Sequence, residues 1–353
     1  MTTSSPPALL YVGVDIAARS FTAASLTPDG PPSKPRTFDQ SPTGFAAFHT
    51  TLCATTIAPC DTLIALEATS TYWVALAVTL HAQGYRVVVV NPAHVHHHAQ
   101  SMTRRSKTDN LDAVLLADFA REKYRRLHDW TPPPQVYHEL RQRLVARDGL
   151  LTMRTQTSNQ MHALEQWPVQ IASVREHLQS VLAMLDEQIA ALERELKGVL
   201  RDGAWAKSAA HLQSITGIGL ITASWLLVGT LNFTTCASAQ SAAHYAGLAP
   251  MKKESGTSVK GREAIGHAGN GRIRTALFMA TMSAATHNEM IKTFYNRLKA
   301  AGKPEKVVRI ACARKLMHLC YAVVTKGQDF DPSFKKPPSL ISVDRGVEME
   351  IAA

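Results

Sequence analysis

The pattern of apolar and polar residues in the first third of the chain predicts a sheet with an intervening helix. Residues 10–27 are rich in β-branched and aromatic residues around a polar turn, which predicts two strands paired as a hairpin. The segments "TLIALEA" (62–68) and "YRVVVVNP" (85–92) predict two further strands, and the second is apolar enough to be buried on both faces. The segment between them has helical length and ends at Gly84, a typical helix C-cap. The alternation favours a mixed α/β domain.

The pattern changes after the segment "TPPPQ" (131–135), which is incompatible with a helix and closes the first domain. A helical region follows, with a 4, 3, 4, 3, 4 spacing of apolar residues that is typical of a coiled-coil seam or a helical hairpin. The residues of this seam are Leu178, Leu182, Leu185, Ile189, Leu192 and Leu196. The seam predicts either a dimer interface or a helix pair within one chain.

A further helical region begins near residue 206 and ends with the apolar-faced helix predicted at 305–326. Within it, Gly217 and Gly219 of "ITGIG" separate two short apolar helical stretches. Such a turn resembles a helix-hairpin-helix, which contacts the DNA backbone through the N–H groups that begin its second helix. The alternative is a turn used only for packing. We therefore predict four segments: an α/β domain at 8–130, a helical linker at 135–205, a mostly helical domain at 206–330 and a polar tail at 331–353.

Composition narrows the class of protein. The chain has 353 residues, 45% of them hydrophobic, and 38 Lys and Arg against 28 Asp and Glu give a net charge of +10. A basic, folded chain of this kind favours a polyanionic partner, with nucleic acid as the first candidate. The five cysteines form no C-x-x-C pair, which argues against a disulfide framework and fits a cytoplasmic location. We expect no secretory leader and no membrane span.

Acidic residues stand where buried strands end. Asp15 ends "VGVD" and Glu67 ends "LIALE", where a carboxylate costs free energy unless it is paired or binds a cation. Asp109 and Asp112 are spaced i,i+3 at the start of a predicted helix and share one face, although Asp109 could be an ordinary N-cap. Four carboxylates are ligands for hard divalent cations, which predicts a site for two Mg²⁺ ions and phosphodiester chemistry.

Hydroxyl residues lie among positive charge in the segment 247–277. Ser255, Thr257 and Ser258 are alternative nucleophiles, and no Asp-His pair of a hydrolase triad accompanies them. A set of basic residues can hold phosphates around them: Lys252, Lys253, Lys260, Arg262, Arg272 and Arg274. Asn270, between two glycines, predicts a turn that presents N–H groups to a phosphate or an ordinary capped turn. Arg104, Arg105 and Lys107 complete the predicted nucleic-acid contacts.

The ordered motifs resemble one family along nearly the whole chain. The motifs "GVDIA", "ALEATSTYW", "VVVVNP", "KTDNLDA", "ITGIG", "YAGLAP", "ESG" and "GNGRIRTAL" occur in the order found in the insertion sequence 110 family of transposases. The resemblance implies an RNase H-like domain of the Holliday-junction resolvase type, a coiled-coil linker and a mostly helical transposase domain. It places the acidic tetrad on Asp15, Glu67, Asp109 and Asp112, and the catalytic serine on Ser255.

The resemblance also implies an activity and its partners. Ser255 would attack a phosphodiester and form a phosphoserine intermediate while the four acids hold Mg²⁺, with donor and target DNA selected by a bridge RNA. Because the acids and the serine lie in different domains, either the chain folds back or the protomers of a dimer or tetramer share a site. The rival functions are a metal-dependent junction nuclease that uses water, and a non-catalytic nucleic-acid-binding protein.

Two features depart from the family pattern. Asn110 stands where many relatives have a basic residue, and the run "HVHHH" (94–98) replaces a lysine- or arginine-bearing pattern. Adjacent histidines lack the separated partners that zinc requires, so we expect this run to contact nucleic acid or to be solvated.

Overall fold

The computed structural model describes residues 7–68, 70–101, 109–251, 254–255, 259–260, 264–266 and 269–333. Side chains are described for these residues except 109, 110, 251, 254, 255, 259, 260 and 264. The chain divides into two compact units, 1–132 and 133–353, and each is described by itself. Among the described residues, no helix is both long and apolar enough to cross a membrane.

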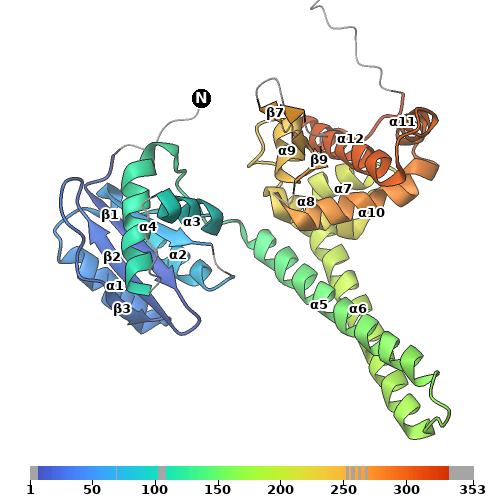
Figure 1. The fold of residues 1–353 in the computed structure, drawn as a ribbon, viewed down its shortest axis with the longest axis horizontal. Coiled ribbons are helices and arrows are strands. Elements are labelled where there is room, and N and C mark those ends of the chain that lie inside the picture. The colour runs from blue at the N-terminus through green and yellow to red at the C-terminus, as the bar shows by residue number, and fades with distance from the viewer. Residues whose placement is uncertain are drawn as a thin grey trace, which may run out of the picture. The chain divides into compact units, whose positions relative to one another are not determined.

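The first unit contains a mixed five-stranded sheet (Figure 1). Its strands lie in the order β3-β2-β1-β4-β5. Strands β1, β2 and β3 form antiparallel neighbours, and β1, β4 and β5 are parallel. The predicted hairpin of β1 and β2 is confirmed, as are the two later strands. The strands are β1 (Leu10–Ile16), β2 (Ser20–Leu26), β3 (Arg36–Asp39), β4 (Thr62–Glu67) and β5 (Arg86–Val90).

Helices cover both faces of this sheet. Helices α1 (Pro42–Cys53) and α2 (Trp73–Ala82) pack on the face formed by Val12, Val14, Ile64 and Leu66. Helices α3 (Pro92–Ser101) and α4 (Asp109–Lys123) pack on the other, which we call the α4 face and which includes Tyr11, Leu63, Ala65 and Val88. The C-cap of α2 is Gln83, one residue before the predicted Gly84, and Gly84 follows it with a φ of 86°, which ends the helix. Short 3-10 turns at Pro59–Asp61 and Tyr124–Arg126 complete the unit.

A glycine lets α4 approach β1 closely. An ideal Cβ on Gly13 would lie 2.2 Å from the Ala113 carbonyl oxygen and 2.3 Å from the Ala117 backbone nitrogen. Neither backbone atom can move aside as the end of a flexible side chain can. Only glycine therefore allows the observed packing of α4 across β1.

The second unit begins with a helical hairpin of α5 (Gln135–Leu164) and α6 (Ala172–Asp202). Ion pairs join the two helices, with Arg143 Nε 2.8 Å from Glu195 Oε2 and Arg147 Nη2 2.6 Å from Glu193 Oε1. In the predicted apolar seam, Leu185, Ile189 and Leu196 are buried and the others are half-buried. The seam thus serves a helix pair within one chain, one of the two alternatives that the sequence left open.

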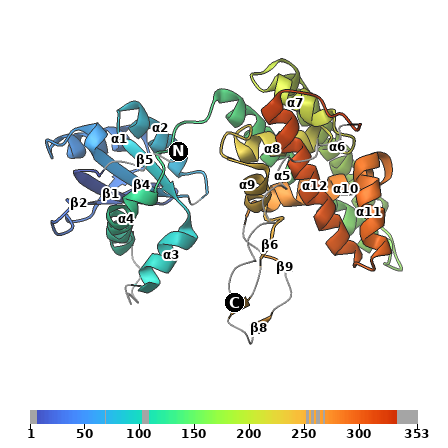
Figure 2. The same cartoon turned by 90° about the horizontal axis from the view of Figure 1, so that it is seen from above.

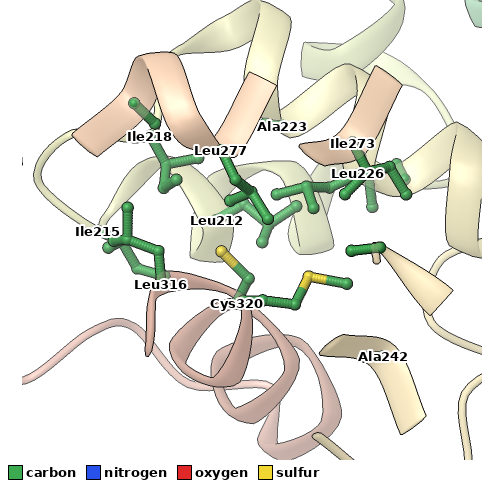
Figure 3. Packing of buried hydrophobic residues seen from close by; sticks show 14 of the residues in the cluster. Leu212, Ile215, Ile218, Ala223, Leu226, Ala242, Ile273, Leu277, Leu316 and Cys320 are labelled. Atoms are coloured by element: carbon green, nitrogen blue, oxygen red, sulfur yellow. The ribbon is translucent and has the colours of Figure 1, made fainter. Parts of the chain in front are cut away.

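The remaining helices form the apolar core of the second unit. Figure 3 shows Leu212, Leu277, Leu316 and Cys320 of three helices converging with Ile215, which lies just after the first of them. The predicted helix at 305–326 is confirmed as α12. The helices are α7 (Ala206–Gln213), α8 (Leu220–Thr230), α9 (Ala239–Tyr245), α10 (Gly271–His287), α11 (Glu289–Ala300) and α12 (Glu305–Lys326).

Two short antiparallel ribbons lie between α9 and α10 in sequence. Strand β6 (Pro250–Met251) pairs with β9 (Ala264–Ile265), and β7 (Glu254–Ser255) pairs with β8 (Val259–Lys260). The second pair is nested in sequence inside the first, and β8 lies farther from the helices than β6 and β9 (Figure 2). We call these two strand pairs, which carry Ser255 in β7, the serine ribbon.

Candidate active site and nucleic-acid contacts

Asp15 and Glu67 occupy equivalent ends of neighbouring parallel strands. The last pair of the β1–β4 ladder is Val14 with Leu66, and each acid is the next residue of its strand. Side chains of a strand alternate between the two faces of the sheet. Asp15 stands an even number of residues after Tyr11, and Glu67 an even number after Leu63, so both acids belong to the α4 face. Both side chains are half-buried. Two of the four predicted acids are thus brought to one edge and one face of the sheet.

The direction of α4 brings its first turn to the same edge. The ring of Tyr124, just after α4, lies 6.1 Å from that of Tyr11 at the start of β1. Arg121, also near the end of α4, donates to the carbonyl of Pro28 at 3.5 Å. Pro28 follows the last residues of β2, and these residues pair with the start of β1. Helix α4 therefore runs antiparallel to β1, and its first turn lies beside the end of β1.

The contact between Gly13 and Ala113 shows which part of α4 lies beside the end of β1, and so where Asp109 and Asp112 lie along β1. Asp15 lies about 7 Å farther along β1 than Gly13. Asp112 directly precedes Ala113, and Asp109 precedes it by about 6 Å of helix rise. Asp112 is half-buried, and the side chain of Asp109 lies outside the described residues. The fold thus places the backbone of α4's first turn level with Asp15, on the α4 face.

The side chains at this edge are of the type that a hard divalent cation prefers, although the three described carboxylates do not form a group whose ligand atoms all lie within 4.8 Å of one another. The described donors are the carboxylates of Asp15, Glu67 and Asp112, and all three side chains are half-buried rather than fully exposed. Carboxylate oxygens are the ligands that Mg²⁺ takes from proteins, together with retained water and substrate phosphate. A cation here would offset the desolvation cost of acids gathered at one edge.

Ser255 lies in strand β7, opposite Val259 of β8. Its side chain is outside the described residues, as are Thr257, Ser258 and the basic side chains of Lys252, Lys253, Lys260 and Arg262. Arg104, Arg105 and Lys107 also lie outside them. The choice among the three hydroxyls therefore remains a prediction, as do these basic contacts.

Arg274 holds the base of the serine ribbon, and Asn270 caps the helix that follows it. Arg274 donates through Nη1 to the carbonyls of Gly247 at 3.4 Å and Gly266 at 3.2 Å, one on each side of the ribbon. The side chain of Asn270 caps α10 by accepting from the backbone nitrogens of Arg272 at 3.1 Å and Ile273 at 3.2 Å. The sequence left open a turn that presents N–H groups to a phosphate and an ordinary capped turn. The structure has the capped turn, because the Asn270 side chain already accepts from the N–H groups of Arg272 and Ile273.

Arg272 remains a candidate phosphate contact. Its guanidinium lies 2.7 Å from Asp148 Oδ2 and 5.8 Å from the ring centre of Trp225, while 64% of its side chain is exposed. The pair with Asp148 orients the guanidinium, and its exposed edge can still donate to a phosphate.

The two glycines of "ITGIG" have different environments. Gly217 has a φ of 104°, and a Cβ there would lie 2.6 Å from the Cβ of Ala284 in α10, so packing requires this glycine. Gly219 is exposed, has open space around it and is the N-cap of α8 without a side-chain cap. The packing turn therefore explains Gly217, and the first N–H groups of α8 remain the candidate contact with a DNA phosphate.

The prediction of a solvated or nucleic-acid-contacting histidine run is wrong for His98. His94, His96 and His97 are exposed, whereas Val95 and His98 are buried against the rest of the unit. The two buried residues are spaced i,i+3, so they share the inward side of α3. That helical spacing is the sequence signal that would have separated His98 from its neighbours.

Comparison with known proteins gives two family matches. Residues 12–166 match the transposase family model for the DEDD domain of the IS110 type, and residues 209–296 match the transposase model of the IS116/IS110/IS902 family. The pilin gene-inverting protein of Moraxella bovis is 30% identical over 329 residues, which cover 91% of this chain and 97% of the relative. The chain belongs to the IS110 family of transposases.

Two other relatives carry insertion-element names. The transposase for insertion sequence element IS1328 of Yersinia enterocolitica is 24% identical over 279 residues, covering 70% of this chain and 79% of the relative. The IS110 uncharacterized 43.6 kDa protein of Streptomyces coelicolor is 32% identical over 154 residues, covering 44% of this chain and 37% of the relative. This IS110-family transposase is thus a phosphoryl-transfer enzyme that binds DNA. Its DEDD domain implies the use of a divalent metal ion.

Proposed function

We propose that this transposase cleaves and exchanges DNA strands of an insertion sequence through a phosphoserine intermediate, with Ser255 as the nucleophile. The observation that carries the proposal is the common position of Asp15 and Glu67, one residue beyond the Val14–Leu66 pair, beside the first turn of α4. The inversion activity in the name of the Moraxella relative is a strand exchange of the same general class.

The four acids would hold the divalent cation. Asp15 and Glu67 supply carboxylates from strand ends, and Asp109 and Asp112 supply them from α4. When bound there, two Mg²⁺ ions would stabilise negative charge on the attacking and leaving oxygens of the phosphodiester. The residues of the chain keep the site rigid, because Gly13 fixes the depth of α4 on β1.

Ser255 would carry the covalent step. Its Oγ forms a bond to phosphorus, the P–O bond of the DNA strand breaks, and the strand oxygen leaves as a hydroxyl after taking up a proton. The hydroxyl proton of the serine passes to solvent or to a neighbouring base. Attack by a second strand's hydroxyl then reverses the bond changes and restores a phosphodiester, so strand exchange needs no external energy source.

The partners complete the proposal. Donor and target DNA would be selected by a bridge-type guide RNA. The acids and the serine belong to different units of the chain, so either the chain folds back or two protomers share the site. The family resemblance favours sharing, so the protein would act as a homo-oligomer, a dimer or a tetramer. Arg272 and the first N–H groups of α8 would contact DNA phosphates, together with the basic residues of the serine ribbon.

The test measures strand cleavage in Mg²⁺ by Asp15→Asn and Glu67→Gln. Each change removes a negative ligand at nearly constant volume, so cleavage should fall by several orders of magnitude while DNA binding is retained. Asp29→Asn, at an exposed position of the same unit, is the matched control and should cleave normally. Normal cleavage by Asp15→Asn or Glu67→Gln would rule out the acidic site.

A further inference from the structure

A second group of metal-ligand side chains joins α3 to α4. His98 of α3 faces Asp118 and Glu122 of α4, and one ligand atom from each lies within 4.8 Å of the others. Asp118 stands six residues after Asp112, which corresponds to about 9 Å along the helix. This group, which we call the His98 cluster, is therefore separate from the acids of the proposed active site.

The two buried members of the His98 cluster lack hydrogen-bond partners. The side chains of His98 and Asp118 are 5% and 10% exposed. Neither His98 Nε2 nor Asp118 Oδ2 has a hydrogen-bond partner among the described residues. A buried imidazole nitrogen and a buried carboxylate oxygen each cost free energy when unsatisfied, so two such atoms facing each other indicate a missing ligand.

The distance between these atoms distinguishes among the possible ligands. His98 Nε2 lies 3.7 Å from Asp118 Oδ2. A direct hydrogen bond would require about 2.7–3.2 Å, and a bridging water with two good hydrogen bonds would separate its partners by about 4.5 Å. Two ligands of one metal ion, each about 2.1 Å from it, lie about 3.4 Å apart at the tetrahedral angle and farther apart at wider angles. The observed separation fits the metal ion best.

Neighbouring side chains orient His98 and Asp118 as the residues around a metal site orient its ligands. Arg121 Nη2 lies 2.6 Å from the other carboxylate oxygen of Asp118, which holds Oδ2 toward His98. The ring of Phe119 meets the His98 ring edge to face at 5.4 Å and fixes its orientation. Glu122 is 45% exposed, and one of its carboxylate oxygens lies within 4.8 Å of a ligand atom of each of His98 and Asp118. Its Oε2 now lies 3.9 Å from the other ring nitrogen of His98, Nδ1, so the side chain would turn toward a cation bound at Nε2 and leave a position for water.

We propose that the His98 cluster binds one divalent transition-metal ion through His98, Asp118 and Glu122. One imidazole and two carboxylates suit Zn²⁺ and its neighbours in the first transition row better than Mg²⁺, which prefers oxygen ligands alone. The ion would clamp α3 onto the helix whose first turn carries Asp109 and Asp112. Its role is structural, and it does not depend on the identity of the nucleophile.

The test titrates the full-length protein, freed of metal by a chelator, with Zn²⁺ in an excess of Mg²⁺ by calorimetry. Wild type should bind one Zn²⁺ tightly and gain thermal stability. Loss of a residue that only supports a metal ligand weakens metal binding about 10- to 100-fold. Zn²⁺ binding should weaken by more than this in each of His98→Gln, Asp118→Asn and Glu122→Gln. Co²⁺ in place of Zn²⁺ should give visible absorption bands that these variants lose.

Two controls locate the ion. His97→Gln changes an exposed histidine of the same helix and should leave Zn²⁺ affinity unchanged. Glu67→Gln alters the proposed active site and should also leave it unchanged. Glu122→Gln replaces a half-exposed side chain, so it remains folded even if the buried variants do not, and circular dichroism checks this. Equal Zn²⁺ affinity in wild type and Glu122→Gln, or loss in His97→Gln, would overturn the proposal, as would the absence of tight binding by wild type.

Discussion

Asp15 of β1 and Glu67 of β4 each stand one residue beyond the Val14–Leu66 pair, at the carboxyl ends of adjacent parallel strands. The parity of their strands places both acids on the face that α4 covers. The position of α4 therefore determines where its first turn, with Asp109 and Asp112, lies relative to these two acids, and that position depends on the close approach at Gly13.

Gly13→Ala should destabilise the first unit and reduce cleavage. The added methyl would overlap the backbone of Ala113 and Ala117, so α4 must shift away from β1 and Asp112 must shift with it. We expect a loss of about 3 kcal/mol in the free energy of unfolding, at the upper end for overpacked cores. The measurement is denaturant unfolding followed by a cleavage assay.

Gly149→Ala is the matched control for Gly13→Ala. Gly149 lies exposed within α5, and a Cβ there meets no heavy atom within 4 Å. Alanine should raise the free energy of unfolding by about 0.5–1 kcal/mol through its helix propensity. Equal stability of Gly13→Ala and wild type would show that α4 tolerates displacement from β1.

Gly219→Asp separates the two interpretations of the "ITGIG" turn. An aspartate at this uncapped N-cap should stabilise α8 by about 1 kcal/mol, because it accepts from the first N–H groups and complements the helix dipole. The same carboxylate would repel a DNA phosphate, so affinity for DNA should fall although stability rises. Gly219→Asn, which caps without charge, should weaken binding less. Unchanged DNA affinity in Gly219→Asp would leave the turn with a packing role alone.

Sequence patterns predicted the sheet strands well but could not give every element. The apolar runs of β1, β4 and β5 carry a strong signal because both faces of the sheet are covered. Strand β3 is short and mostly exposed, so its residues show no such pattern. Helix α1 does have a local signal, since Ser41 caps it and Pro42 begins it, but this region was not predicted.

The site was predictable only where a residue's type conflicted with its surroundings. Asp15 and Glu67 stand out as acids at the ends of apolar strands. Gly13 does not stand out, because the need for a glycine arises from contact with a helix about 100 residues later in the sequence. His98 was hidden among exposed histidines, and its partners Asp118 and Glu122 come from another helix.

The cysteines should divide into two reactive and three protected thiols. Cys53 and Cys60 are exposed, whereas Cys236, Cys312 and Cys320 are buried. Burial is the main cause that raises the pKa of the Cys312 thiol to about 11, and it also raises the pKa of Cys236 and of Cys320. These three thiols therefore stay protonated at neutral and mildly alkaline pH. A disulfide reagent at pH 8 should label two thiols in the folded protein and five in denaturant. Rapid labelling of more than two in the folded protein would contradict the described core.

The proposed mechanism requires that Ser255 becomes covalently joined to DNA. Wild type and Ser255→Ala are incubated with end-labelled cognate DNA, guide RNA and Mg²⁺, then denatured and separated by electrophoresis. Thr257→Ala and Ser258→Ala serve as matched controls for the neighbouring hydroxyls. We expect labelled DNA that comigrates with wild type and with both controls, and neither cleavage nor adduct with Ser255→Ala. An adduct that persists in Ser255→Ala would move the nucleophile to another residue, and cleavage by wild type without any adduct would show that water is the nucleophile.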